Sequence, residues 1–199
     1  MDKNLVKCVM MPTALLTKIH KRSEVLRKIE DVDWVMVSQK INKHLKLHFK
    51  DYPCATIAGF SQHKNEPDVF PFLKFWYQQG GTCCLPVIKT IDSPLRFYRW
   101  DCTKTLVKGM YNILVPKDES EVTPDVILTP LIAFDERGFR LGKGGGYYDR
   151  TIQAMRHNNQ RPYVIGVAAK EQFVQFLETD RHDQKLDMVV TDSGCITFM

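Results

Sequence analysis

Residues 54–88, CATIAGFSQHKNEPDVFPFLKFWYQQGGTCCLPVI, predict a strand, a helix and a second strand in succession. The strands are expected over 54–60 and 82–88, because both are short apolar runs bounded by turn residues. The helix is expected over 71–79, since it opens with proline and is closed by Gly80. A strand–helix–strand unit favours parallel strands, so this stretch indicates an α/β protein.

The elements on either side extend this pattern. Two helices are expected before any strand, the first capped by Thr13 and the second opened by Asp33, which precedes an apolar stripe at helical spacing. After the unit we expect an edge strand at 95–100, a buried strand at 125–134, a helix at about 147–157, a strand at 163–168, a final helix near 170–178 and short strands at 188–191 and 195–198. The alternation predicts a mostly parallel sheet.

The chain has 199 residues, of which 44% are hydrophobic and 26% charged. This length predicts one domain over 1–199, with a helical part at 1–50 and an α/β core at 51–199. No apolar run approaches the roughly 20 residues that span a bilayer, and the stretch 9–16 is a poor secretory signal. The six cysteines contain no C-x-x-C pair, so we expect reduced thiols and a cytoplasmic protein.

Positive charge is concentrated in the first quarter of the chain. Residues 1–50 hold 11 Lys or Arg and five Asp or Glu, a net charge of +6, whereas the remainder holds 17 and 18. Such an excess can attract nucleic acid, receive a small polyanion such as ATP, or form a solvated helix face. Charge alone leaves these three interpretations open.

A glycine-rich turn, RLGKGGGYYDR at 140–150, lies between the buried strand and the next helix. Glycines let backbone amides approach phosphate oxygens, and the following helix N-terminus favours an anion. Arg140 and Lys143 add positive charge. The spacing matches neither a Walker loop nor a dinucleotide fingerprint, so the alternative is a flexible turn.

The longer segment around this turn, PLIAFDERGFRLGKGGGYYD at 130–149, closely resembles the signature of the 5-formyltetrahydrofolate cyclo-ligase family. The resemblance extends over about 38–191 and includes Asp187 before the last strands, although Val115 stands where bacterial members commonly carry an acid. It implies ATP- and Mg²⁺-dependent conversion of 5-formyltetrahydrofolate to 5,10-methenyltetrahydrofolate. It also implies a three-layer α/β/α fold akin to sugar-phosphate isomerases and CoA transferases.

The resemblance implies a role for each residue of the site. ATP would contact Lys18, Arg22, Arg140, Leu141, Gly142, Lys143, Gly144, Gly145, Gly146 and Tyr148. The folate would contact Phe60, Ser61, Glu66, Tyr111 and Tyr147, and magnesium would bind Asp149 and Asp183. Arg140, Lys143 and Tyr147 are expected to act in catalysis.

Several of these residues have plain structural alternatives. Lys21 and Arg27 compete with Lys18 and Arg22 for the nucleotide, and Asp149 is also placed as a first-turn acid that complements a helix dipole. Asp183 and Asp187 can each be a solvated turn or a strand-start cap, and Glu66 can be a surface loop acid.

The expected partners are therefore folate and ATP, with the protein a monomer and neither nucleic acid nor membrane involved. Two other functions stay open. One is a nucleic-acid-binding module that uses the basic N-terminal helix, with affinity that falls steeply with salt. The other is a phosphosugar isomerase or CoA-transferase-like enzyme, which would need no ATP.

Overall fold

The computed structural model describes residues 13–198 and is built around a seven-stranded sheet. The strand order is β11-β10-β9-β6-β1-β2-β3, with parallel pairing from β10 through β2 and an antiparallel strand at each edge. The strands are β1 (Thr56–Ala58), β2 (Thr82–Val87), β3 (Arg96–Arg99), β6 (Val126–Pro130), β9 (Tyr163–Val167), β10 (Met188–Thr191) and β11 (Gly194–Thr197). The helices are α1 (Thr13–Lys28), α2 (Trp34–His48), α3 (Phe70–Gln78) and α4 (Tyr147–His157). The predicted mostly parallel sheet is confirmed.

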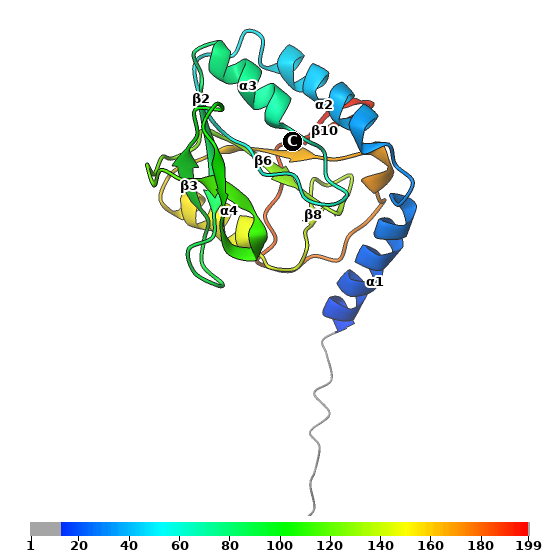
Figure 1. Ribbon diagram of the computed structural model, residues 1–199. Coiled ribbons are helices and arrows are strands. Elements are labelled where there is room, and N and C mark those ends of the chain that lie inside the picture. The colour runs from blue at the N-terminus through cyan, green and yellow to red at the C-terminus, as the bar shows by residue number, and fades with distance from the viewer. Residues whose placement is uncertain (1–12, 199) are drawn as a thin grey trace, which may run out of the picture.

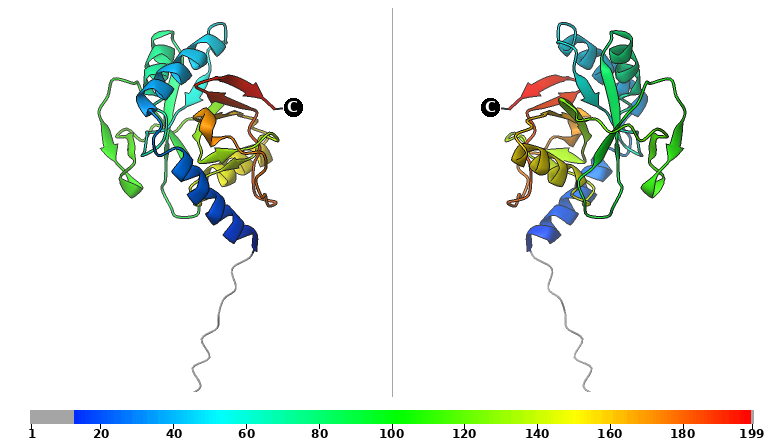
Figure 2. Two further views of the ribbon diagram at one scale, coloured as in Figure 1. Left: turned by 90° about the vertical axis from the view of Figure 1, so that its right-hand side faces the viewer. Right: turned by 90° about the vertical axis from the view of Figure 1, so that its left-hand side faces the viewer.

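Helices cover both faces of the sheet (Figure 1). Because side chains alternate along a strand, Ile57 and Leu128 pack with α2 and α3, whereas their neighbours Ala58 and Ile127 pack with α4. The two side views in Figure 2 show the same separation of α2 and α3 from α4. The three-layer α/β/α arrangement follows from this alternation.

Local signals account for several element ends. Asp33 caps α2, since its Oδ1 accepts from the backbone amides of Val35 and Met36 at 3.1 and 3.0 Å. Gly80 follows α3 with φ +87°, a left-handed conformation that suits glycine at a helix C-terminus. The Thr13 side chain, the expected cap of α1, lies outside the part of the chain that the structure describes.

The expected single strand at 125–134 is wrong. β6 ends at Pro130, and the chain then leaves the sheet to form a small hairpin, in which β7 (Ala133–Phe134) pairs antiparallel with β8 (Arg140–Leu141). Proline has no amide hydrogen to continue a ladder. The buried carboxylate of Asp135 closes the hairpin by accepting from the amides of Arg137 and Phe139 at 3.0 Å each.

The helix expected near 170–178 is also wrong. Only a single 3₁₀ turn forms, η2 (Lys170–Gln172), and the chain then runs extended. The reason is tertiary: the Val174 amide donates to the Phe134 carbonyl at 2.9 Å, and the Gln172 side chain donates to the Leu131 carbonyl at 2.7 Å. The first contact uses a backbone amide that a helix would have satisfied internally, and the second holds the Gln172 side chain against the segment after β6.

A second small hairpin is missing from the expected elements. It consists of β4 (Leu106–Lys108), the 3₁₀ turn η1 (Met110–Asn112) and β5 (Leu114–Pro116). Its strands are three residues long and partly exposed, so they carry little periodic signal. At its tip Tyr111 and Asn112 adopt left-handed φ values of 56° and 59°.

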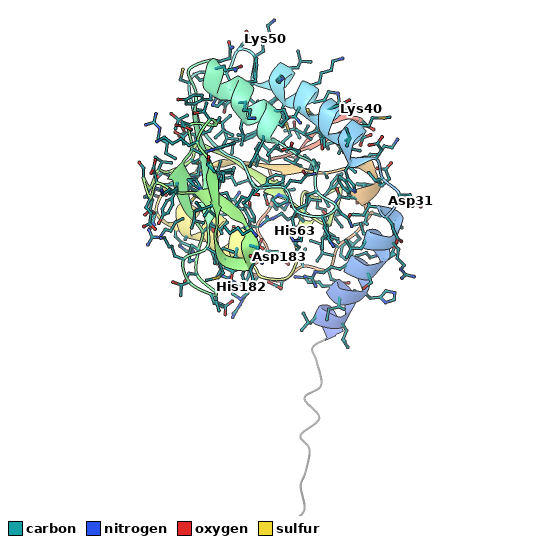
Figure 3. The ribbon with its side chains drawn as sticks, in the orientation of Figure 1. Asp31, Lys40, Lys50, His63, His182 and Asp183 are labelled. Carbon is teal, nitrogen blue, oxygen red and sulfur yellow. The ribbon has the colours of Figure 1, made fainter. Side chains whose placement is uncertain are left out.

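The lysines at and after α2 lie on the surface, and most of the described cysteines are buried. Figure 3 shows Lys40 on the outer side of α2 and Lys50 just beyond the end of that helix, both away from the sheet. Cys83 and Cys84 are buried in β2, as expected for packing thiols, and burial raises the pKa of Cys84. The described cysteines are free thiols. Among residues 13–198 no helix is both long and apolar enough to cross a bilayer.

Candidate active site

The topology creates a crevice between β1 and β6. From β1 the chain adds β2 on one side, whereas β6, β9 and β10 lie on the other, so the strand order reverses at this point. In open α/β sheets, ligands bind in such crevices at the carboxyl ends of the strands. The segment after β1 carries Glu66, and the segment after β6 leads through the β7–β8 hairpin to the glycine turn.

A cavity of about 290 Å³ lies in this crevice. Its apolar lining consists of Leu26 in α1, Ile29 directly after that helix, and Leu131 and Ile132 after β6. Its polar lining consists of Arg22, Lys64, Asn65, Glu66, Lys143 and Gln172. A larger cavity, of about 360 Å³, lies between β3 and the β4–β5 hairpin, and none of the predicted site residues lines it.

The glycine turn has the backbone geometry that its composition predicts. Gly144 and Gly146 have φ values of +105° and +63°, which residues with a Cβ atom rarely adopt. Gly146 is also the N-cap residue of α4, and no side chain caps that helix start. The turn therefore presents a helix N-terminus whose first amides have no partner among residues 13–198, a favourable environment for an anion.

Helix α1 reaches this turn through the residues that the family resemblance indicated. Arg22 donates from Nε to the Gly142 carbonyl at 2.8 Å, and its guanidinium lies over Gly144. Lys18 donates from Nζ to Asp183 at 2.7 Å and to Asp180 at 2.9 Å. Although burial acts to lower it, these two bonds raise the pKa of Lys18.

The two competing basic residues of α1 stay within their own helix. Lys21 pairs with Glu24 at 2.7 Å, and Arg27 donates from Nε to the Ser23 carbonyl at 3.2 Å. The structure thus brings Arg22 to the glycine turn and Lys18 to Asp183, whereas Lys21 and Arg27 contact neither.

Arg140 lies behind the turn rather than on its open side. Its side chain is 2% exposed, and it donates from Nη2 to Asp149 Oδ1 and from Nη1 to the Gln184 carbonyl, both at 2.8 Å. Burial lowers the pKa of Arg140, and the nearby carboxylates of Asp149 and Asp183 oppose that shift. Arg140 therefore ties β8 to α4 and to the segment that carries Asp183.

Glu66 and Lys143 join the two sides of the crevice. Lys143 Nζ lies 2.6 Å from Glu66 Oε1, while Glu66 Oε2 accepts from the His63 amide at 2.9 Å. Glu66 is 4% exposed, so the alternative of a surface loop acid is wrong. Lys143 has a half-exposed side chain and is able to move.

The expected ring-binding residues are divided between the crevice and the core. Tyr147, at the start of α4, lies near Tyr111 from the hairpin tip, and the interaction with this tyrosine raises the pKa of Tyr147. Tyr148, the second residue of α4, packs against the buried residues between α4 and the sheet, and burial raises its pKa. Phe60 is 3% exposed in the core between the sheet and α2.

The two remaining predicted residues have no contact that shows a role. Ser61 lies in the segment that follows β1, is partly exposed and does not line the cavity. Leu141 is buried under the turn with Val25 of α1 and with Ile29, which directly follows that helix.

The carboxylates expected at magnesium each keep one oxygen open. Asp149 Oδ1 accepts from Arg140 and from the Gln184 amide, and Asp183 Oδ2 accepts from Lys18 and from the Asp180 amide, whereas their second oxygens have no partner within residues 13–198. No cluster of three or more His, Cys, Asp or Glu side chains in that range is arranged to hold a metal. Two carboxylates fit Mg²⁺, which commonly uses one or two together with phosphate oxygens and water.

Asp187, the alternative to Asp183, has a structural role. Its Oδ2 accepts from the Val164 amide at 2.7 Å, which fixes the start of β9. It thus acts as the strand cap that the sequence left open.

Sequence reasoning missed several residues around the cavity. Lys64 and Asn65 immediately precede Glu66, and Asn65 has a φ of 58°, so a turn signal was available there. Gln172 carried no such signal, because the sequence was interpreted as a helix near 170–178 and a residue within a helix is not expected to line a cavity. Asp180, the second partner of Lys18, lies three residues before Asp183 in an irregular segment that carried no motif.

Comparisons with known proteins identify the family of the chain. The model of the 5-formyltetrahydrofolate cyclo-ligase family covers residues 17–192. The 5-formyltetrahydrofolate cyclo-ligase of Escherichia coli K12 is 38% identical over 144 residues, which are 69% of this chain and 78% of that protein. The enzyme of the same name from Saccharomyces cerevisiae is 35% identical over 208 residues, covering 92% of this chain and 98% of its own length.

Solved structures agree. The 5,10-methenyltetrahydrofolate synthetase of Mycoplasma pneumoniae superposes with a TM-score of 0.69 at 29% identity, over 88% of this chain and 98% of that one. The Aquifex aeolicus 5,10-methenyltetrahydrofolate synthetase gives 0.73 at 25% identity, over 90% and 92%. The family match includes every predicted site residue from Lys18 to Asp183, and the chain belongs to the 5-formyltetrahydrofolate cyclo-ligase family.

Proposed function

We propose that the protein converts 5-formyltetrahydrofolate and ATP to 5,10-methenyltetrahydrofolate, ADP and phosphate, with Mg²⁺. The observation that carries this proposal is the contact between Glu66 and Lys143, at 2.6 Å across the crevice. It joins the acid expected to recognise the pterin with the turn expected to hold phosphate. Two substrates bound on these two sides would meet at their reactive ends.

The chemistry explains why both substrates are needed. An N-formyl group is an amide, so its carbon is weakly electrophilic and its oxygen leaves poorly. When the formyl oxygen attacks the γ-phosphate, ADP departs, and N10 then closes on the activated carbon as phosphate leaves. The closure is intramolecular and is accelerated by proximity. Catalysis of the first step is mostly positioning and charge stabilisation.

The residues of the turn are suited to this task. The amides of Gly144, Gly145 and Gly146 would receive phosphate oxygens, and Arg22 and Lys18 would add charge from α1. Arg140, the most buried member, would act by fixing Asp149. Mg²⁺, when bound by Asp149 and Asp183, would neutralise phosphate charge.

The folate side would be built from Glu66 and the two tyrosines. A carboxylate accepts hydrogen bonds from the amino and ring N–H groups of a pterin. Tyr147 and Tyr111 would provide flat apolar surfaces for the rings, since they lie near each other at the N-terminal end of α4.

Lys143 would change partners during the cycle. Both Glu66 oxygens are engaged without substrate, one by Lys143 and one by the His63 amide. A pterin that takes Oε1 displaces Lys143, whose half-exposed side chain is then available to the phosphates. Folate binding would thereby increase the positive charge at the turn.

The direct test is an incubation of the purified protein with 5-formyltetrahydrofolate and Mg-ATP, following the methenyl chromophore and ADP. We expect product only with both ATP and Mg²⁺. Folate turnover without ATP, or none at all, would contradict the proposal, and turnover of a phosphosugar or an acyl-CoA would favour the isomerase or transferase alternative.

We further propose that the protein works as a cytoplasmic monomer on small molecules. The free thiols of the described cysteines and the use of Lys18 and Arg22 at the site support this view. Size-exclusion chromatography with light scattering tests the monomer. A nucleic-acid titration at low and high salt tests the basic-module alternative, for which steep salt dependence would be expected.

A further inference from the structure

We propose that Arg150 is a positioning residue for the reaction, holding the glycine turn and the Tyr147 ring in their reactive orientation. The inference rests on the proposed function. Arg150 lies in the first turn of α4, and its guanidinium bends back toward the residues that precede the helix.

Three contacts join Arg150 to the site. Its Nη2 donates to the Gly145 carbonyl at 2.6 Å, and its guanidinium lies over the Tyr147 ring at 5.0 Å from the centroid. Its Nη1 lies 2.8 Å from the position that a Cβ atom on Gly146 would occupy. One side chain thus touches the carbonyl, the bare backbone and the aromatic ring at the start of α4.

The carbonyl contact sets the direction of an amide. The Gly145 carbonyl and the Gly146 amide belong to one planar trans peptide group, so they point in opposite directions. When Arg150 holds the carbonyl, the Gly146 amide is directed away from Arg150. Within residues 13–198 that amide makes no hydrogen bond, so it is available to an anion.

The ring contact acts on the folate side. A guanidinium over a tyrosine face restrains the ring through a cation–π interaction. The Tyr147 ring also lies near Tyr111 of the hairpin tip, since that tyrosine raises the pKa of Tyr147. Arg150 therefore links the orientation of the phosphate-facing amide to that of the folate-facing ring.

The contacts of Arg150 are not those expected of a residue that serves only to stabilise the fold. Its Nε is buried without a hydrogen-bond partner in the described part of the chain, and its nearest carboxylate, Asp92, is exposed and 3.7 Å away. An unsatisfied buried donor is destabilising, and an apolar side chain of similar length avoids that cost. A structural role alone predicts that Arg150→Met is tolerated, whereas a positioning role predicts a loss of turnover.

The test compares the wild-type enzyme with Arg150→Met, Arg150→Lys and Arg150→Ala. Arg161→Ala serves as a control, because Arg161 is exposed and makes no hydrogen bond or ion pair within the described residues. We expect Arg150→Met to keep the wild-type melting temperature while kcat falls about 30- to 100-fold, as misplacement by an ångström can cause. Arg150→Lys should recover part of this loss, since an ammonium donates to the carbonyl but does not match a planar guanidinium over the ring.

Chemical rescue separates positioning from folding. Millimolar guanidinium should raise the turnover of Arg150→Ala several-fold and leave Arg161→Ala unchanged. Turnover of Arg150→Met within threefold of wild type would overturn the inference, as would a loss that guanidinium does not reverse in Arg150→Ala. If Arg150→Met does not fold, Arg150→Lys and the rescue decide by the same criteria. An inactive wild-type enzyme would instead overturn the proposed function itself.

Discussion

Helices α1 and α2 both carry an excess of positive charge, but their cations have different contacts. In α2 the apolar stripe Val37, Ile41 and Leu45 is buried against the sheet, and its lysines form no ion pair within residues 13–198. Among the described side chains of α1, those from residue 15 on, only Val25 is fully buried, and two of its cations contact Asp183 and the glycine turn. Charge composition therefore does not identify a ligand-binding site, whereas the position of a helix relative to the strand ends does.

The largest effect should come from breaking the buried stripe of α2. Ile41 is 0% exposed, so Ile41→Ala should reduce the free energy of unfolding by about 3 kcal/mol through lost burial and a cavity. In α1, Ile19 is 43% exposed, and Ile19→Ala should change it by less than about 0.5 kcal/mol. Urea unfolding of both variants measures the difference, and equal losses would contradict the assigned roles of the two helices.

The next largest effect should come from removing a cation of α1. Arg22→Met removes the guanidinium at the glycine turn, so kcat/KM for ATP should fall about 100-fold. The matched change in α2, Lys40→Met, should leave ATP kinetics unchanged, because Lys40 faces away from the sheet (Figure 3). Steady-state rates at varied ATP decide between them, with melting temperatures as the folding control. A similar loss in both variants would favour a general charge effect.

A smaller effect is expected from a substitution outside both helices, which leaves the cations of α1 unchanged. Glu66→Gln keeps the shape but removes the charge that faces Lys143, so the folate KM should rise about tenfold. The KM for ATP should stay within about twofold, since Lys18 and Arg22 are untouched. A selective loss of ATP affinity would remove Glu66 from its proposed role.

These outcomes bear on how much of the molecule its sequence predicts. Elements with local signals are predictable: the Asp33 cap starts α2, and the glycine turn ends where α4 begins, at the expected Tyr147. Gln172 and Pro130 show the limit. There the chain satisfies its backbone through tertiary contacts, with the Leu131 carbonyl and the Phe134 carbonyl as acceptors, and no local pattern records such partners.

The site follows the same rule. The resemblance indicated which residues belong to it, but not that Arg140 would be buried behind the turn or that Lys143 would pair with Glu66. Both features depend on how the segments after β1 and β6 approach each other. That approach is set by the strand order, which single-sequence patterns do not contain.

The smallest expected effect is the pH dependence of the α1 attachment. Hydrogen bonding from Lys18 lowers the pKa of Asp180, so this contact stabilises the fold above the ordinary aspartate value and is lost as pH falls through the lower folded value. Below about pH 4, Lys18→Met should therefore lose stability less steeply than wild type, by less than about 1 kcal/mol because Asp180 is half-exposed. Lys43→Met in α2 should follow wild type. Acid unfolding curves measure this, and identical slopes for Lys18→Met and wild type would contradict it.

A crystal structure with a non-hydrolysable ATP analogue and Mg²⁺ tests the central claim most directly. We predict that the terminal phosphate contacts the amides of Gly144–Gly146, with Lys18 and Arg22 of α1 beside it and no contact from α2. A nucleotide bound elsewhere, with these amides facing only solvent, would contradict the account.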